Sequence, residues 1–470
     1  MAGVFVRRNA WDLSADDETL PAYGRAVGVM KERDDDDPTS WAYQAKMHGS
    51  PTIPPGSLWN QCEHQSWFFV VWHRMYLHHF EEIVRAAVIE TGGPDDWALP
   101  YWNYELGGEK ATLPKAFRDP ENEDGSTNFI FVSQRRPGVN QGGMIPPQLA
   151  SAAEALARPA YIGTAEFGGG EAPPHEQFWG QAGTLEMTPH NAIHNVLGGE
   201  EGWMADPDQA ALDPIFWLHH ANIDRVWAEW QAVDGHDDPT ESAWTEQEYE
   251  FFDPNGGKVS RVCAKAVDTV ADFGYTYDPA PGGGAEARKP SAPMPDKTPP
   301  DPKFVGATEE TVTLVGKQSR VPVEIDPRAN EEAAQASRQA DPRHVYLNLE
   351  DIEAERNPGS TYGIYVNLPE DPSPDDLERH HAGNLSFFGI ERTRDPRGDE
   401  HPHNLRMSVE VGGLLDSLSE GGWNGEKVDV TLRPIGLLPP EGAPEEVARE
   451  MESSGEDPPV HVGRISIAVQ

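Results

Sequence analysis

The stretch TLEMTPHNAIHNVLGGEEGWMADPDQAALDPIFWLHHANIDRVWAEW, residues 184–230, holds two pairs of histidines on two predicted helices. The helices cover 188–198 and 213–232, and each opens with a capping residue followed by a first-turn proline. His190 and His194 stand one helical turn apart, so both imidazoles project from the same face. A zinc-protease motif would need glutamate directly after the first histidine, where this chain has Asn191.

The second helix offers a third imidazole to this pair. His219 and His220 are adjacent and point about 100° apart, so one metal cannot take both. We predict His220 as the ligand, because Asp224 lies one turn further on and either orients that ring or pairs with Arg225. His219 is then a packed or hydrogen-bonded neighbour. Three neutral imidazoles suit copper, zinc, iron or nickel rather than magnesium or calcium.

A second group of histidines lies in MHG…CEHQSWFFVVWHRMYL, residues 47–77. A predicted helix over 66–90 places His73 on its apolar stripe, while His78 and His79 are rotated about 140° and 240° away and are predicted non-ligands. His64 can share a metal with His73 only from a loop before the helix. His48 is the remaining candidate for the third position.

Composition excludes several classes of function. The net charge of −42, from 79 acidic and 37 basic residues, repels nucleic acid and anionic membranes, so neither is expected as a partner. No apolar run approaches the length of a membrane span. The N-terminal segment has no apolar core typical of a secretory signal, which predicts a cytoplasmic protein, with export alongside a partner as the alternative.

The hydrophobic period changes along the chain and predicts a multidomain α+β fold. Helices are expected at 11–34, 40–47, 66–90 and 147–156, besides the two above. Residues 279–303 are rich in proline and form a predicted linker. Seven runs of period two between 311 and 470 then predict an antiparallel β-sandwich. The expected domains are therefore 1–278, mainly helical, and 304–470.

These motifs resemble those of the tyrosinase and polyphenol oxidase family, the type 3 copper proteins. HQSWFFVVWHRMYL at 64–77 is similar to the first copper motif of the family, and DPIFWLHHANID at 213–224 to the second. Residues 259–278, with Tyr275 and Tyr277, resemble the end of the plant-type catalytic domain, and 345–470 resemble its C-terminal domain. Only two cysteines are present and a transit peptide is not seen, which indicates a bacterial rather than a plant source.

The resemblance implies a four-helix core around two copper ions, with O2 as co-substrate. One copper is expected on His48, His64 and His73, and the other on His190, His194 and His220. It also implies a thioether bond from Cys62 to His64, because several family members carry one at this Cys-x-His spacing. Cys263 is expected in the core.

The implied activity is o-hydroxylation of monophenols and oxidation of o-diphenols to o-quinones. Glu186 and Asn191 match family residues that hold a water as a base, and they are the candidate catalytic residues; a helix N-terminal charge is the alternative for Glu186. Met204 and Pro207 are expected to border the entrance.

The C-terminal domain is expected to shield the site and keep the enzyme latent until it is removed or displaced. Leu385, Phe387 or Phe388, in GNLSFFGIE, are candidates to plug the pocket, with core packing as the alternative. The remaining histidine pairs, at 380–381 and 401–403, are expected on loops.

Three rival functions stay open at this point. They are a catechol oxidase without hydroxylase activity, an o-aminophenol oxidase, and a haemocyanin-like oxygen carrier. Small phenols and O2 are the expected partners, and the oligomeric state is not predicted. A di-iron carboxylate protein is disfavoured, because Glu-x-x-His pairs do not accompany these histidines.

Overall fold

The computed structural model describes residues 3–175, 180–279, 303–308, 310–328, 344–393, 405–420, 427–440, 442–451 and 457–470. The chain divides into two compact units: unit 1 comprises Met1–Ala292 with Leu437–Met451, and unit 2 comprises Pro293–Gly436 with Glu452–Gln470. Most of the predicted linker, 280–302, lies outside the described residues. The division at 278 and 304 therefore stays a prediction.

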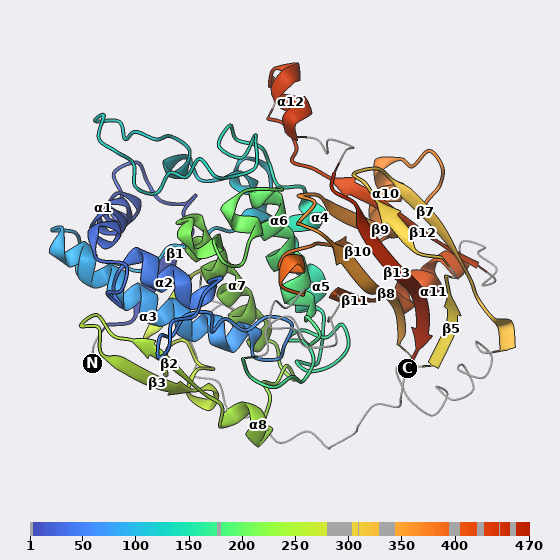
Figure 1. The fold of residues 1–470 in the computed structure, drawn as a ribbon, viewed down its shortest axis with the longest axis horizontal. Helices are drawn as coiled ribbons and strands as arrows, with labels where there is room; N and C mark the ends of the chain where they lie inside the picture. The colour runs from blue at the N-terminus through green and yellow to red at the C-terminus, as the bar shows by residue number, and fades with distance from the viewer. Residues whose placement is uncertain are drawn as a thin grey trace. The chain divides into compact units, whose positions relative to one another are not determined.

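Four helical segments of unit 1 carry five of the six predicted ligand histidines, all except His64 (Figure 1). Helix α2 spans Trp41–His48 and α3 spans Phe69–Glu90. A π-helical turn, η4 (Glu186–Asn191), leads into α6 (Ala192–Gly198), and α7 spans Ile215–Gln231. Helices α3 and α7 are buried along most of their length, including polar residues such as Arg74 and Asp224. They form the centre of the unit.

The helix predictions differ from the structure mainly at helix starts. The helix predicted over 11–34 is α1, Thr19–Glu32, and the one predicted over 147–156 is two short helices, α4 (Pro147–Ala150) and α5 (Ala153–Leu156). Thr188 has the extended conformation expected of a cap, with φ −146° and ψ 124°, and a helical turn precedes it. Asp213 caps α7 as predicted, since its carboxylate accepts from the Ile215 amide at 3.1 Å.

Short elements complete the first part of unit 1. Strand β1 pairs in parallel with β4, and β2 pairs antiparallel with β3. The bounds of the strands and remaining helices are β1 Phe5–Arg8, η1 Tyr104–Leu106, η2 Gly108–Ala111, η3 Lys115–Phe117, η5 Trp203–Ala205, η6 Ala210–Leu212, α8 Ser242–Thr245, β2 Glu248–Phe252, β3 Lys258–Val262, η7 Cys263–Lys265 and β4 Tyr275–Asp278.

A late segment of the chain, Leu437–Met451, also belongs to unit 1. Met144 and Leu438 exchange backbone hydrogen bonds at 2.8 Å in both directions. Met451, the last residue of α12 (Glu445–Met451), is buried against Gly138, which has a φ of +92° and no space for a side chain. The chain therefore leaves unit 2 after strand β12 and returns to it before β13.

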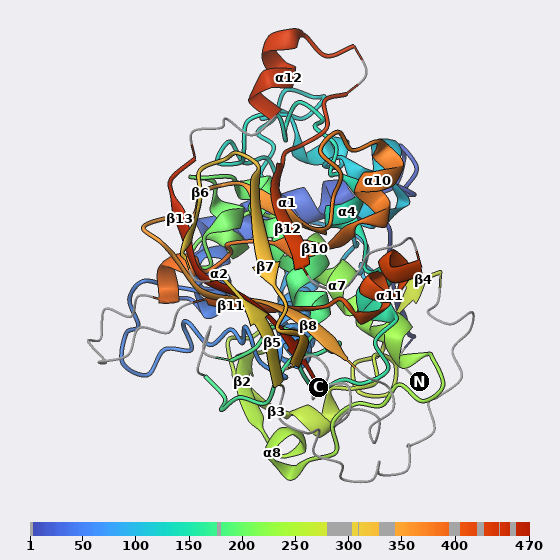
Figure 2. The ribbon, with the colours of Figure 1, turned by 90° about the vertical axis from the view of Figure 1, so that its right-hand side faces the viewer.

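Unit 2 is built from two antiparallel sheets (Figures 1 and 2). One has the strand order β10-β9-β12-β7, and the other β11-β8-β13-β5, with β6 also paired to β13. Gly383 of β10 lies against Val409 of β11, so the sheets face each other as a sandwich. The bounds are β5 Lys303–Ala307, β6 Val312–Leu314, β7 Ser319–Glu324, β8 Val345–Ala354, β9 Thr361–Val366, α10 Pro374–Arg379, β10 His381–Leu385, η9 Ile390–Thr393, β11 Leu405–Glu410, α11 Gly412–Glu420, β12 Lys427–Ile435 and β13 Val460–Val469.

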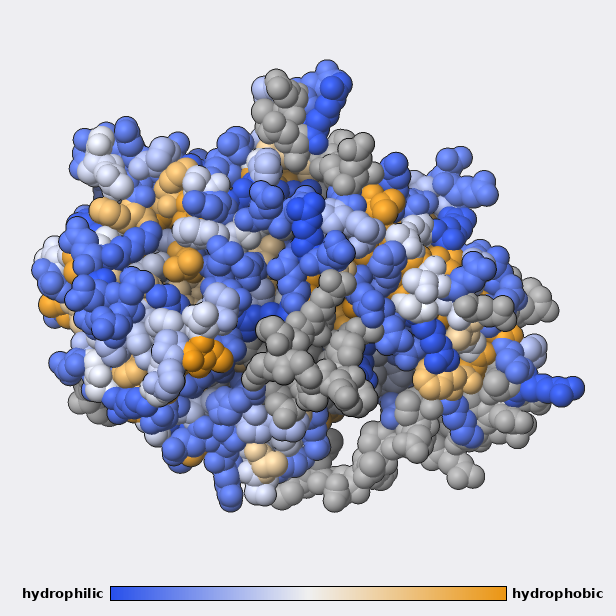
Figure 3. Space-filling model, viewed as in Figure 1, coloured by the Kyte–Doolittle hydropathy of each residue, from blue (hydrophilic) through white to orange (hydrophobic). Residues whose placement is uncertain are grey.

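The α+β fold class predicted from the sequence is confirmed, with a helical part followed by antiparallel sheets. All seven period-two runs form strands, whereas β5 and β10 were not predicted. Figure 3 shows a surface on which hydrophilic residues predominate, as the acidic composition requires. Among the described residues, no helix is long and apolar enough to cross a membrane.

Candidate metal centre

The first group of metal-binding side chains is His48, His64 and His73, with Cys62 beside them, and all four are buried. His48 is the last residue of α2 and His73 lies on α3. His64 lies on the loop before α3, where the phase of the sequence required it. Each of the four residues offers one potential ligand atom, and these four atoms all lie within 4.8 Å of one another.

Backbone carbonyls orient two of these rings. Nδ1 of His48 lies 2.9 Å from the carbonyl of Pro207, and Nδ1 of His73 lies 2.8 Å from the carbonyl of Phe69. A carbonyl only accepts, so Nδ1 of each ring carries the proton. Each Nε2 therefore keeps its lone pair for a metal.

The sulfur of Cys62 lies against the His64 ring. Sγ is 3.3 Å from Nδ1 and 3.7 Å from Nε2 of His64, so it lies close to the ring carbon that these two nitrogens flank. Sγ is also 3.3 Å from Nε2 of His73. Cys263 is buried elsewhere, as expected of a core residue.

The second group contains His190, His194 and His220, with His219 beside them. Nδ1 of His194 lies 2.7 Å from the Met204 carbonyl, and Nδ1 of His190 lies 2.9 Å from Oδ1 of Asn191. The Nε2 atoms of His194 and His220 are 3.3 Å apart. This separation suits two ligands of one ion, each about 2.0–2.1 Å from it.

His219 has a different partner from His220. Its Nδ1 lies 3.2 Å from the hydroxyl of Tyr104, and its ring stacks at 5.5 Å on that of His190. This is the hydrogen-bonded, packed neighbour that the sequence predicted.

The two groups face each other across one buried space. The rings of His73 and His220 stack with centroids 4.4 Å apart and planes 11° apart, and those of His64 and His190 are 5.6 Å apart. Phe69 and Phe216 pack against the same cluster, at 4.6 Å from His190 and 4.2 Å from His220. The six predicted ligands therefore surround a single binuclear pocket.

Burial keeps four imidazoles of this pocket neutral. It lowers the pKa of His73 and of His194 to about 3, and that of His190 and His220 well below the ordinary value. Neutral imidazole is the form that binds a metal. Six neutral nitrogen ligands without a carboxylate suit copper, and the site has the composition of a type 3 centre.

A buried carboxylate, Glu186, joins the two groups. Both of its oxygens accept from the backbone N–H of Gln65, at 2.8 and 2.9 Å. Gln65 follows His64, and Glu186 precedes His190 by one turn. Burial raises the pKa of Glu186 to about 8, and the Gln65 amide offsets part of that rise. A nearby metal charge acts in the opposite direction to burial and favours the carboxylate.

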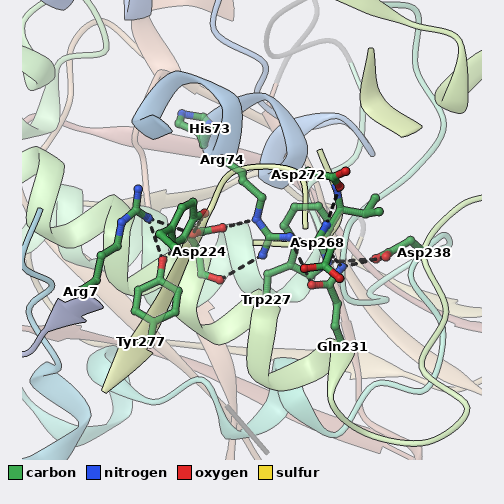
Figure 4. A network of polar contacts seen from close by, with 12 residues as sticks. Arg7, His73, Arg74, Asp224, Trp227, Gln231, Asp238, Asp268, Asp272 and Tyr277 are labelled. Carbon is green, nitrogen blue, oxygen red and sulfur yellow. Dashed lines mark hydrogen bonds and ion pairs between the residues drawn. The ribbon is translucent and has the colours of Figure 1, made fainter. Parts of the chain in front are cut away.

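A network of buried charges connects α3 and α7 behind the histidines (Figure 4). Arg7 and Arg74 reach Asp224 from opposite sides, and Tyr275 and Tyr277 donate to the same carboxylate. The prediction that Asp224 orients His220 or pairs with Arg225 is wrong, because two arginines and two tyrosines occupy it. Arg7 comes from β1 and also pairs with Glu81 at 2.6 Å.

Other residues near the centre were missed by sequence reasoning. Glu63 is buried and accepts from the hydroxyl of Tyr249 and the amide of His175, both at 2.7 Å. Met204 and Pro207, expected at an entrance, are buried and contribute the carbonyls described above. These contacts join residues more than 100 positions apart or use backbone atoms, so the sequence carried no signal for them.

The remaining predicted residues lie in unit 2. Leu385 pairs with Tyr362 in the sheet, and Phe387 packs on the Tyr362 ring at 6.0 Å. Phe388 is buried. His380 and His381 lie at the end of α10 and the start of β10 rather than on a loop. His401 and His403 lie outside the described residues. The plugging role of Leu385, Phe387 or Phe388 stays a prediction.

Comparison with known proteins finds a matching family model for each part of the chain. Residues 38–141 and 170–233 match the common central domain of tyrosinase, and 301–470 match a domain of unknown function, DUF7868. Tyrosinase HcTyr1 of Hahella sp. (strain CCB-MM4) is 32% identical over 461 residues, which cover 91% of this chain and 95% of that protein. The latent form of the polyphenol oxidase of Prunus armeniaca is 25% identical, over 89% of this chain and 71% of its own.

Solved structures share the fold over the whole chain. A latent aurone synthase, a polyphenol oxidase, aligns with a TM-score of 0.64 at 22% identity and covers 100% of this chain and 90% of its own. Latent apple tyrosinase aligns with a TM-score of 0.64 at 21% identity, over 100% of this chain and 97% of its own.

Proposed function

Because the chain belongs to the tyrosinase and polyphenol oxidase family, whose members are binuclear copper oxidoreductases acting on phenols, we propose that it both hydroxylates monophenols and oxidises o-diphenols. The balanced reactions are monophenol + O2 → o-quinone + H2O, and two o-diphenols + O2 → two o-quinones + two H2O. The copper pair supplies the electron exchange with O2. The protein supplies the pocket, the orientation of the phenol and the handling of its proton.

The observation that carries the proposal is the position of Glu186. Hydroxylation of a monophenol requires the phenol to lose its O–H proton before its ring is attacked. An o-diphenol already carries both oxygens, so its ring is not attacked. Glu186 is a buried acceptor between the two histidine groups, and its oxygens can hold a water as well as the Gln65 amide. In this proposal that water takes the phenol proton and Glu186 accepts it, as a positioned base does.

Asn191 is the second residue assigned to this step. Its Oδ1 accepts from Nδ1 of His190 at 2.9 Å, which holds the side chain beside the second metal position. We propose that its amide group orients the same water from the side opposite Glu186. Proton transfer from a positioned group is worth roughly 10²–10⁴-fold in rate, which sets the scale of the effect expected.

The test compares monophenol and o-diphenol turnover by the copper-loaded full chain. Glu186→Gln and Asn191→Ala are expected to lower kcat for tyramine roughly 10²-fold or more and to change kcat for catechol far less. Glu201→Gln, an exposed glutamate in the loop before η5, is the matched control and should change neither. Catechol turnover without tyramine turnover by the unaltered chain would reject the hydroxylase and leave a catechol or o-aminophenol oxidase.

We also propose that Cys62 and His64 become joined by a thioether bond. The S–H bond of Cys62 and the C–H bond of the ring carbon that lies between the two nitrogens would break, and a C–S bond would form. The two electrons and two protons released would reduce O2 to H2O2, an oxidation that copper held by the histidines would promote. The closeness of Sγ to that ring carbon supports the assignment. The bond would hold the ring of a ligand that is otherwise on a loop.

Latency is the third part of the proposal, and it takes 304–470 as a shielding domain after a linker at 279–303. Leu385, Phe387 or Phe388 remain the residues assigned to the plug. Cleavage within 279–303 leaves Leu437–Met451 as part of unit 1, so a single cut does not release the C-terminal chain by itself. The assay therefore compares the intact chain, the cut chain, and the cut chain after mild denaturant. Equal activity in all three would reject latency.

A further inference from the structure

A third group of metal-binding side chains lies on helix α3, outside the binuclear pocket. It consists of His78, His79 and Glu82, whose potential ligand atoms lie within 4.8 Å of one another. We propose that these three residues bind a third metal ion, a first-row divalent cation of the zinc or copper type. The site is independent of the phenol chemistry proposed above.

The distances in this group fit ligands of a shared ion better than a hydrogen bond. Nε2 of His78 and Nδ1 of His79 each lie 3.4 Å from the same oxygen, Oε2 of Glu82. Hydrogen bonds between nitrogen and a carboxylate are shorter, about 2.7–3.2 Å. Two ligand atoms bound at about 2.0–2.1 Å to a tetrahedral ion stand about 3.3–3.4 Å apart.

The local sequence and packing hold this geometry without a metal. Glu82 lies one turn above His78 on α3. The adjacent His78 and His79 leave the helix about 100° apart, but His78 offers Nε2 and His79 offers Nδ1, and both of these atoms reach the same Glu82 oxygen. The ring of His78 packs on Phe273 at 4.5 Å, and that of His79 stacks on Phe251 at 5.2 Å. The aromatic contacts limit the rotamers of both rings, which lowers the entropy cost of binding an ion.

Exposure and donor type define the ion that the site accepts. The side chains of His78 and His79 are 12% and 3% exposed, and that of Glu82 is 36% exposed, so an ion can enter from solvent beside the carboxylate. Two imidazoles and one carboxylate suit zinc, copper or nickel rather than magnesium or calcium. A water would complete four-coordination.

Arg261 of β3 opposes binding. Its Nε donates to Nε2 of His79 at 3.2 Å, so Nδ1 of His79 carries the ring proton in the metal-free chain. An ion bound at Nδ1 of His79 displaces that proton, and the neutral ring then carries its proton on Nε2. A protonated Nε2 cannot accept from Arg261, so Arg261 must turn away. Arg261 is only partly buried, so this movement is open to it. Removing Arg261 should therefore strengthen binding, an effect that nonspecific binding to an acidic surface would not show.

The experiment is equilibrium dialysis against Zn²⁺ of the full chain loaded with only two equivalents of copper, followed by metal analysis. Copper resists replacement by zinc at imidazole sites. One zinc per chain is expected beside the copper. Glu82→Gln should weaken zinc binding roughly 10- to 100-fold or more, as loss of even an outer partner does. Arg261→Ala should strengthen it, and Glu90→Gln, an exposed glutamate at the end of the same helix, should leave it unchanged.

Two results would overturn the site. One is that the unaltered chain retains no zinc beyond its copper. The other is that Glu82→Gln and Glu90→Gln behave alike. If Glu82→Gln does not fold, Co²⁺ bound to the unaltered copper-loaded chain gives a second reading. Tetrahedral nitrogen and oxygen ligation predicts intense visible absorption that excess Zn²⁺ abolishes, and a spectrum of aqueous octahedral Co²⁺ would contradict the proposal.

Discussion

The carboxylate of Glu186 and the backbone amide of Gln65 join the two halves of the metal centre, at 2.8 and 2.9 Å. Gln65 has a φ of +53°, a conformation that a side-chain-bearing residue rarely adopts. Gln65, next to His64, is thus held in this strained backbone conformation by Glu186, one turn before His190. The position of one ligand loop depends on the helix that carries the other ligands.

Glu186→Ala and Glu186→Gln should separate this structural role from the proton-transfer role. Alanine leaves the buried Gln65 amide without its acceptor, which costs about 1–3 kcal/mol of unfolding free energy. Glutamine keeps a carbonyl acceptor, so its stability should stay close to that of the unaltered chain. Denaturant unfolding of the copper-free chains measures the difference. Equal destabilisation by both substitutions would contradict the role given to the hydrogen bond with the Gln65 amide.

Asp224→Asn should destabilise the chain by about 3–5 kcal/mol, because Arg7 and Arg74 would lose the charge that balances them in a buried site. Glu229→Gln is the matched control on the same helix. Glu229 pairs with Arg225 but is 35% exposed, so the expected cost is about 0–1 kcal/mol. Thermal unfolding compares the two, and similar midpoints would contradict the role given to the Asp224 network.

The thioether should appear as a change in thiol count and in mass. The copper-free chain has two free thiols, Cys62 and Cys263. After copper and O2 are supplied, the denatured chain should have one, and its mass should fall by that of two hydrogen atoms. Cys62→Ser should show neither change. Alkylation of both cysteines after turnover would contradict the bond.

Stability should fall in mild acid because of buried neutral histidines, and His78 offers a measurable case. Burial lowers the pKa of His78 to about 3, against 6.5 in the unfolded chain. Between these values the unfolded chain binds a proton that the folded chain does not, so unfolding free energy falls by up to about 1.4 kcal/mol per pH unit as pH decreases. Above pH 6.5 this effect is absent. His78→Gln should remove the contribution of one proton, up to about 1.4 kcal/mol per pH unit, from the slope of unfolding free energy against pH. An unchanged slope would contradict the burial argument.

Much of the centre could be predicted from the sequence, because helical periodicity decides which imidazoles share a face. His190 and His194 follow from spacing, and the half-turn phase between His64 and His73 correctly required a loop. The partners of Asp224 could not be predicted this way. Within its helix the carboxylate is one turn from His220, but Arg7 and Arg74 compete for it from 217 and 150 residues away.

The fold was predictable where strands and helices are long. Strands β8, β12 and β13 have clear alternation of apolar and polar residues, and α3 has a long apolar stripe. Strand β10 was not predicted because its sequence, HAGNL, contains a glycine, a histidine and an asparagine. Strands β1 and β4 have four residues each and pair across about 270 positions, so local pattern says little about them.

Copper content of the full chain tests the central claim most directly. The measurement is best made in the Glu82→Gln chain, so that the third site on α3 is not counted. Two coppers per chain are expected, with one lost in His220→Gln and both kept in His219→Gln. One copper or none in the parent chain, or loss of copper in His219→Gln but not in His220→Gln, would contradict the binuclear centre as assigned.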